Sequence, residues 1–216
     1  MKKYKLVIFD MDGTILDTIE DIKDAVNVAL EHYGYPVRTV SEVKRAVGNG
    51  LRKTLERSLP APVDEETFGQ IYSYMIEHYS FHSADKTKPY DGIVEVIRKI
   101  KDMGYDTAVI SNKKESAVKD LCEKFYKGLF NYSLGEKEGR RPKPYPDAVN
   151  YVLEEMKIES KEAIYIGDSE VDIETAKNSN MDSIIVTWGF REEEFLISKG
   201  AKTFARYPGE LLEILQ

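Results

Sequence analysis

The sequence predicts an α/β protein with a doubly wound, Rossmann-like parallel sheet and a helical-bundle cap inserted after the first strand. Short apolar runs that end at Phe9, Ile110, Ile166 and Val186 are typical of buried strands. Amphipathic helical patterns separate the last three runs, and such alternation favours a parallel sheet covered by helices on both faces. Between residues 17 and 85 only helical patterns occur, which indicates a small bundle.

The individual elements can be followed along the chain. The first strand is expected at Tyr4 to Phe9, a β-branched apolar run that is too short for a helix. Four stripes of apolar residues at helical spacing predict the bundle, and they are represented by Ile22, Val43, Leu55 and Met75. Core helices are predicted at Ile93–Met103 and Ala148–Met156, and weaker strands at Tyr132–Leu134 and Thr203–Ala205. We therefore expect an α/β core of residues 1–16 and 86–216 and an inserted helical cap of residues 17–85, joined by two crossings that could act as a hinge.

Composition limits the classes of protein to consider. The chain has 216 residues, a net charge of −7 and one cysteine, Cys122. The acidic balance argues against a nucleic-acid-binding protein, which would present a basic face. A single cysteine rules out a disulfide within the chain and fits a reducing compartment. Apolar runs fall short of the about 20 residues that a membrane helix needs, and Met1–Tyr4 lacks the pattern of a signal peptide. We expect a cytoplasmic monomer or homodimer without nucleic-acid or membrane partners.

Four polar clusters follow the predicted strands or lie near them. They are Asp10-x-Asp12-Gly13-Thr14, Ser111-Asn112, Lys143 between two prolines, and Gly167-Asp168-Ser169-Glu170-Val171-Asp172. Taken singly, Ser169-x-x-Asp172 and Asn112-x-x-Glu115 fit helix capping boxes. Lys143 taken singly would be an ordinary lysine in a solvated loop. However, ligands of open parallel sheets bind at the carboxyl ends of the strands. Convergence of all four clusters at that edge favours a common site.

The paired carboxylates Asp10 and Asp168 indicate what this site binds. Two unit charges about 4 Å apart repel by about 4 kcal/mol at an effective dielectric constant near 20, so neighbouring carboxylates call for a divalent cation. Oxygen ligands suit Mg²⁺, which commonly takes one or two carboxylates, waters and a phosphate oxygen. Lys143 would neutralise further negative charge, and Ser111 would donate a hydrogen bond. The sequence therefore predicts a magnesium site built for a phosphoryl group.

These motifs, in this order, resemble those of the haloacid dehalogenase superfamily of phosphotransferases over essentially the whole chain. The resemblance implies that Asp10 is the nucleophile that forms an aspartyl-phosphate. It also implies that Asp12 is the general acid and base. A carboxylate at position 12 argues against dehalogenation, because a halide leaves without a proton.

The same resemblance implies roles for the other clusters. Mg²⁺ would be held by Asp10, the main-chain carbonyl of Asp12, and Asp168, with Asp172 as a further ligand or as a residue behind the ligands. Phosphate binding is implied for Ser111, Asn112 and Lys143, and the catalytic Lys143 would also steady the nucleophile.

The loop Val47–Leu55 resembles the cap specificity loop of phosphoglycolate phosphatases. Gly48, Asn49 and Arg52 are candidates for contacting the non-phosphate end of a substrate. The alternative is a simple glycine turn with a solvated arginine. Phosphonate-cleaving relatives use a cap lysine, for which Lys53 is the nearest candidate. The resemblance thus implies a Mg²⁺-dependent phosphatase acting on a small phosphorylated metabolite of the phosphoglycolate type.

Three alternatives share parts of this pattern. A phosphosugar mutase of the β-phosphoglucomutase type carries the same four motifs, and an inorganic pyrophosphatase is another close relative. A receiver-like signalling module also phosphorylates an aspartate of a parallel sheet, but that residue normally ends the third strand, whereas Asp10 ends the first. The sequence leaves the choice among these open.

Overall fold

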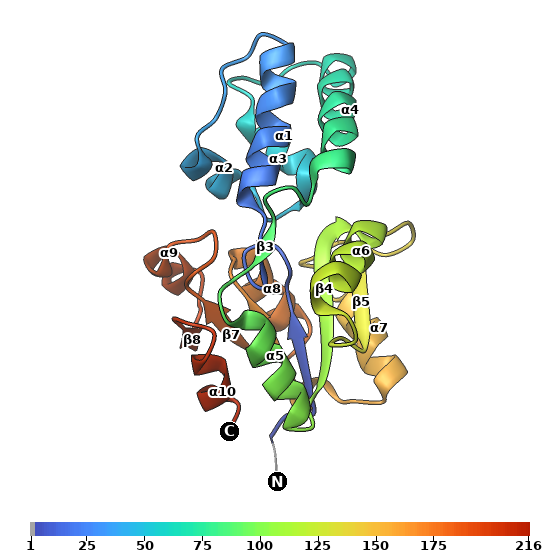
Figure 1. Cartoon of the computed structure of the whole chain (residues 1–216), viewed down its shortest axis with the longest axis vertical. Coiled ribbons are helices and arrows are strands. Elements are labelled where there is room, and N and C mark those ends of the chain that lie inside the picture. Colours follow the sequence, from blue (N-terminus) through green and yellow to red (C-terminus); the bar gives the residue numbers. More distant parts are fainter. Residues whose placement is uncertain (1–2) are drawn as a thin grey trace. The chain divides into compact units, whose positions relative to one another are not determined.

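The computed structural model describes residues 3–216, which divide into two compact units (Figure 1). The α/β unit consists of the chain up to Leu16 together with Pro89–Gln216, and the helical unit is Asp17–Lys88. The chain crosses between them at β2 (Leu16–Asp17) and β3 (Lys88–Pro89), which pair as a two-stranded sheet.

The α/β unit is built on one six-stranded parallel sheet. Its strands lie in the order β5-β4-β1-β6-β7-β8. Their bounds are β1 Leu6–Phe9, β4 Asp106–Lys114, β5 Tyr132–Glu136, β6 Ala163–Gly167, β7 Asp182–Val186 and β8 Phe204–Ala205. The chain extends the sheet to one side of β1 through β4 and β5, and to the other side through β6, β7 and β8. Doubly wound sheets bind ligands at the central strand, where the strand order reverses direction. The predicted fold class is confirmed.

Successive side chains of a strand point to opposite faces of the sheet. Because apolar side chains are buried on both faces, helices cover both. The helices are α5 Ile93–Asp102, α6 Glu115–Tyr126, α7 Asp147–Met156, α8 Glu170–Asn178, α9 Glu193–Ser198 and α10 Glu210–Ile214, with a 3₁₀ turn at Ser160–Glu162. Leu6 and Ile8 of β1 share a buried cluster with residues of α7 and α8. Phe9 points to the other face, where its ring meets Phe130, which in turn meets Tyr126 of α6. All four residues of β1 are fully buried.

One strand differs from its prediction. The apolar run of β4 ends at Ile110, but the strand continues to Lys114. Its pairing with β5 shifts register between these two residues, as at a β-bulge. A bulge re-aims side chains at the end of a strand, so Ser111, Asn112 and Lys113 lie in an irregular strand end and not in a loop.

The helical unit consists of α1 Ile19–His32, α2 Val40–Ala46, α3 Gly50–Ser58 and α4 Glu65–His82. Polar residues set the helix starts: Thr39 and Glu42 form a capping box at α2, and Asp64 caps α4. Near the exit from this unit, both oxygens of Asp21 accept hydrogen bonds from the main-chain N–H of Lys86, and one also accepts from that of Thr87. These bonds fix the last residues of the unit to its first helix.

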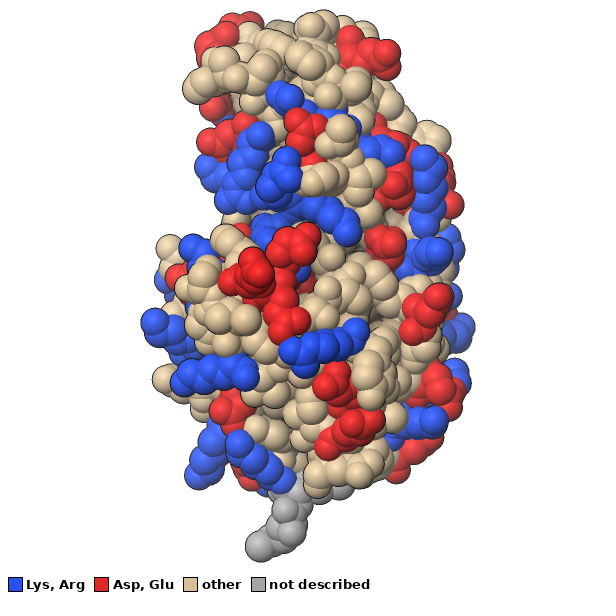
Figure 2. All heavy atoms as spheres, turned by 90° about the vertical axis from the view of Figure 1, so that its left-hand side faces the viewer, with Lys and Arg blue, Asp and Glu red and all other residues tan. Residues whose placement is uncertain are grey.

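Acidic and basic side chains are interspersed on the face of the α/β unit that carries α9 and α10, as Figure 2 shows. Within residues 3–216, no helix combines the length and apolar character needed to span a bilayer.

Candidate active site

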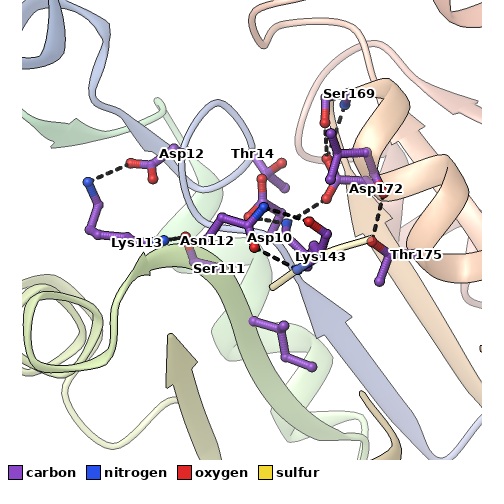
Figure 3. A network of polar contacts seen from close by, with 12 residues as sticks. Asp10, Asp12, Thr14, Ser111, Asn112, Lys113, Lys143, Ser169, Asp172 and Thr175 are labelled. Atoms are coloured by element: carbon purple, nitrogen blue, oxygen red, sulfur yellow. Dashed lines mark hydrogen bonds and ion pairs between the residues drawn. The ribbon is translucent and has the colours of Figure 1, made fainter. Parts of the chain in front are cut away.

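Asp10 follows the last residue of β1 and is the centre of the site. Its main-chain N–H donates to the carbonyl oxygen of Ile166 at 2.8 Å, which continues the ladder to β6 for one residue beyond the strand. The residue is 7% exposed. Oδ1 of its carboxylate lies 2.7 Å from Nζ of Lys143 (Figure 3). The Asp10 carboxylate therefore lies buried at the C-terminal edge of the sheet, and one of its oxygens is held by the Lys143 ammonium.

Lys143 is shared between two carboxylates. Its Nζ donates to Oδ1 of Asp10 and to Oδ1 of Asp172, each at 2.7 Å. Burial alone would lower the pKa of Lys143, but Asp10 and Asp172 raise it well above its usual value, so the side chain stays charged. The amide of Asn112 holds the lysine main chain from both sides: its Nδ2 donates to the Lys143 carbonyl at 3.0 Å, and its Oδ1 accepts from the Lys143 N–H at 2.7 Å.

Asp168, after β6, is held by two separate segments of the chain, Gly13-Thr14 and Gly189-Phe190. Oγ1 of Thr14 approaches its Oδ1 at 3.4 Å, and the main-chain N–H of Phe190 donates to its Oδ2 at 2.7 Å. Gly13, at φ +88°, and Gly189 lie so close that a Cβ at either position would collide with the Asp168 side chain. Burial, with Asp172 adding to the effect, raises the pKa of Asp168 to about 7.

Asp172 lies in the first turn of α8 and is fully buried. Its Oδ2 accepts from Oγ of Ser169 at 2.7 Å and from the N–H groups of Asp168 and Ser169 at 3.2 and 3.1 Å. The predicted capping box Ser169-x-x-Asp172 is thus present. The other predicted capping box, at Asn112, is wrong: Lys114 precedes α6 without a side-chain cap, and the Asn112 amide is used on Lys143 instead.

The carboxylates of Asp10, Asp168 and Asp172 offer ligand atoms that all lie within 4.8 Å of one another. All three are buried, and the ammonium of Lys143 neutralises only part of their charge. Burial, together with Asp172, also raises the pKa of Asp10 well above its usual value, which Lys143 opposes. A divalent cation with oxygen ligands would relieve this repulsion. The residues present therefore fit a hard divalent metal ion.

Asp12 points away from this cluster, toward Lys113 (Figure 3). Its Oδ1 lies 3.2 Å from Nζ of Lys113. Ser111 is buried, and its Oγ accepts from the main-chain N–H of Lys113 at 3.2 Å. The end of β4 thus brings Ser111 and Asn112 to the edge at which Asp10 and Asp168 lie.

The predicted specificity residues belong to the helical unit. Gly48 and Asn49 precede α3, and Arg52 lies in its first turn. Oδ1 of Asn49 accepts from Nη2 of Arg57 at 2.7 Å. The Arg52 guanidinium lies 4.5 Å from the centroid of the Phe68 ring and pairs with Glu65.

For two parts of the site the sequence predicted no specific contact. Lys113 carries a buried ammonium beside Asp12, yet in the sequence it is one lysine of a Lys-Lys pair. The Gly189-Phe190 segment supports Asp168 through its main chain, which the side-chain pattern does not reveal. Gly189 itself, three residues after the end of β7, was the one feature of the sequence that indicated a close approach of the main chain.

Comparison with known proteins identifies the family of the chain. A family model described as haloacid dehalogenase-like hydrolase matches residues 7–186. Phosphoglycolate phosphatase 1 of Pseudomonas aeruginosa is 30% identical over 193 residues, covering 86% of this chain and 70% of that protein. Phosphoglycolate phosphatase of Psychrobacter arcticus is 30% identical over 194 residues, covering 86% and 84%.

A solved structure from Lactobacillus delbrueckii subsp. bulgaricus, described as a candidate phosphoglycolate phosphatase, extends the similarity to three dimensions. It is 35% identical with a TM-score of 0.95, covering 100% of this chain and 99% of that one. The chain belongs to the haloacid dehalogenase-like hydrolases and is an enzyme similar to the phosphoglycolate phosphatases within them.

Proposed function

We propose that this enzyme is a Mg²⁺-dependent phosphatase of small phosphomonoesters that works through an aspartyl-phosphate at Asp10. The observation that carries the proposal is the grouping of Asp10, Asp168 and Asp172 around Lys143 at the carboxyl edge of the sheet. This grouping combines a nucleophile, ligands for a hard cation and a fixed positive charge. Phosphoryl transfer depends mainly on positioning and electrostatic stabilisation of this kind.

Two displacements at phosphorus account for the reaction. An oxygen of Asp10 bonds to phosphorus while the bond to the leaving oxygen breaks, and that oxygen takes the proton of the Asp12 carboxylic acid. The Asp12 carboxylate then takes a proton from water as the water oxygen bonds to phosphorus. The Asp10–phosphorus bond breaks, and inorganic phosphate leaves.

The remaining residues hold the charge in place. Lys143 donates to phosphoryl oxygens and keeps Asp10 oriented, Ser111 donates a hydrogen bond, and Asn112 contributes through the Lys143 main chain that it grips. When bound, Mg²⁺ would be held by Asp10, the main-chain carbonyl of Asp12 and Asp168, and it would neutralise charge on the transferring group. Both oxygens of Asp172 already accept hydrogen bonds, which favours a place behind the ligands.

Phosphoglycolate is the substrate that we favour, because relatives that match 86% of the chain carry that name. Residues 17–85 would serve as the cap, in which Gly48, Asn49 and Arg52 select the non-phosphate end of the substrate. Arg52→Ala should then change the ranking of substrates and raise KM for phosphoglycolate. An unchanged ranking with an unchanged KM would remove Arg52 from this role. We place the enzyme in the cytoplasm, in keeping with its single cysteine.

The test is a panel of phosphorylated metabolites assayed with Mg²⁺: phosphoglycolate, hexose phosphates, nucleotides and diphosphate. Release of inorganic phosphate from phosphoglycolate is expected, with loss of turnover in a folded Asp10→Asn variant. Appearance of a phosphosugar isomer would identify a mutase, and preference for diphosphate a pyrophosphatase. A phospho-aspartate that persists without turnover would identify a receiver-like switch.

A further inference from the structure

Lys113 is a buried cation to which the reaction described above gives no part. It follows Ser111 and Asn112 at the irregular end of β4, and its side chain is 4% exposed. Its Nζ lies 3.2 Å from Oδ1 of Asp12, on the side of the nucleophile loop away from Lys143 (Figure 3). Burying an ammonium costs free energy unless a countercharge faces it, and Asp12 supplies one.

The contact leaves Asp12 open to the reacting atoms. Oδ1 of Asp12 is buried, yet it accepts no hydrogen bond from any residue that the structure describes. Lys113 therefore attracts this oxygen without occupying it in a hydrogen bond. The Asp12 side chain is 22% exposed, and that exposed surface belongs to its other atoms. One end of the carboxylate is thus anchored while the remainder stays accessible.

The fold fixes the main chain of Lys113 closely. Its N–H donates to Oγ of Ser111 at 3.2 Å. Gly135 of β5 packs on the carbonyl of Lys113 and on the main chain of Glu115, so that an added Cβ would lie 2.6 Å from the Glu115 nitrogen. Arg140 donates to both the Gly135 carbonyl and the Glu115 carboxylate. This packing determines where the Lys113 side chain begins.

We propose that Lys113 is a positioning residue that holds the Asp12 carboxylate in the orientation from which it exchanges protons with the leaving oxygen and with water. The inference rests on the proposed function, since it assigns Lys113 to the general acid and base of that reaction. A group misplaced by about 1 Å can cost about 10²-fold in rate, which sets the scale of the expected effect.

The experiment uses Lys113→Met, with Lys114→Met as the matched control because Lys114 is the exposed neighbour. Enzyme in excess over p-nitrophenyl phosphate gives two products in a single turnover. Nitrophenolate leaves without a proton, so its release reports the attack by Asp10. Release of inorganic phosphate reports the later step, in which Asp12 activates water.

In Lys113→Met we expect nitrophenolate release close to wild type and phosphate release slower by about 10²-fold. Steady-state kcat for phosphoglycolate should fall similarly, with little change in KM. Lys113→Arg should recover part of the loss, because it restores a cation beside Asp12. Lys114→Met should behave as wild type in every assay.

Other outcomes would overturn the inference. A purely structural defect would slow both products equally, and a lysine that binds the substrate would raise KM with both single-turnover rates unchanged. If Lys113→Met does not fold, Lys113→Gln is read by the same two rates. A wild-type enzyme without Mg²⁺-dependent phosphate release would overturn the proposed function itself, whereas an active wild type matched by Lys113→Met would overturn only this inference.

Discussion

The main-chain N–H of Phe190 donates a 2.7 Å hydrogen bond to Oδ2 of Asp168, so the loop after β7 holds the carboxylate that follows β6. The loop is itself tied to the first motif, because Nε1 of Trp188 donates to the carbonyl of Thr14 at 3.0 Å. Between them lies Gly189, where an added Cβ would meet the Asp168 side chain and lie 2.6 Å from the carbonyl oxygen of Gly13.

Gly189→Ala should therefore displace Asp168. We expect weaker Mg²⁺ binding, lower turnover and a stability loss of about 1–3 kcal/mol from overpacking. Mg²⁺ titration and urea denaturation measure these effects. Gly69→Ala is the matched control, because an added Cβ there meets no atom within 4 Å; in a helix interior it should add about 0.5–1 kcal/mol of stability. Equal behaviour of the two variants would contradict the role given to Gly189.

Asn112→Ala should lower turnover through Lys143. The variant loses both amide contacts to the Lys143 main chain, each worth about 1 kcal/mol of stability, and it frees the lysine to move away from Asp10. Asn178→Ala serves as the control. Nδ2 of Asn178 donates to the carbonyl of Pro144, the residue after Lys143, at an exposed position. A selective fall in kcat for Asn112→Ala is expected from steady-state assays, and equal kcat values would refute it.

Lys143→Met should be destabilising as well as inactive. It leaves Asp10 and Asp172 buried without their common cation, and breaking a buried ion pair from one side costs about 3–5 kcal/mol. Chemical denaturation in the presence of a chelator measures the loss without interference from metal. Lys161→Met removes an exposed lysine paired with Glu159 and should leave stability almost unchanged. A stable Lys143→Met protein would show that these carboxylates need no cation.

Removal of metal should make stability depend on pH through Asp168. Burial raises the pKa of this group from 3.8 to about 7. A folded-state pKa above the unfolded value contributes stability that is complete below the unfolded pKa and is lost as pH rises through the folded pKa. In chelator, the free energy of unfolding should thus decline from about pH 4 to about pH 7, and Mg²⁺ should restore more of it at higher pH.

Asp168→Asn isolates this contribution. Surface carboxylates such as Asp147 and Asp182 act in the opposite direction, because Arg141 and Lys3 lower their pKa values, but both proteins share them. The difference in unfolding free energy between wild type and Asp168→Asn should grow as pH rises. A difference that does not change with pH would contradict the assigned pKa.

Sequence reasoning succeeded where function depends on side-chain type at a strand end. Asp10 and Asp168 follow apolar strands that the sequence reveals, and Asp172 lies in the same motif as Asp168, so the convergence of the carboxylates could be predicted from the parallel sheet. Only the capping-box reading of Asn112 failed, because its amide contacts the main chain of Lys143 and not the start of α6. The contact between Lys113 and Asp12 was not predicted, because the direction of a side chain after a register shift depends on the neighbouring strand.

One oxygen of the Asp172 carboxylate accepts the hydrogen bonds that cap the start of α8, and the other accepts from the Lys143 ammonium. Fraying of the first turn of α8 would therefore leave the Lys143 ammonium with Asp10 as its one remaining carboxylate partner among those described. Local unfolding of this turn, by heat or by mutation, is therefore expected to lower turnover before the sheet itself unfolds. The order of the helix start and the placement of Lys143 thus depend on the same carboxylate.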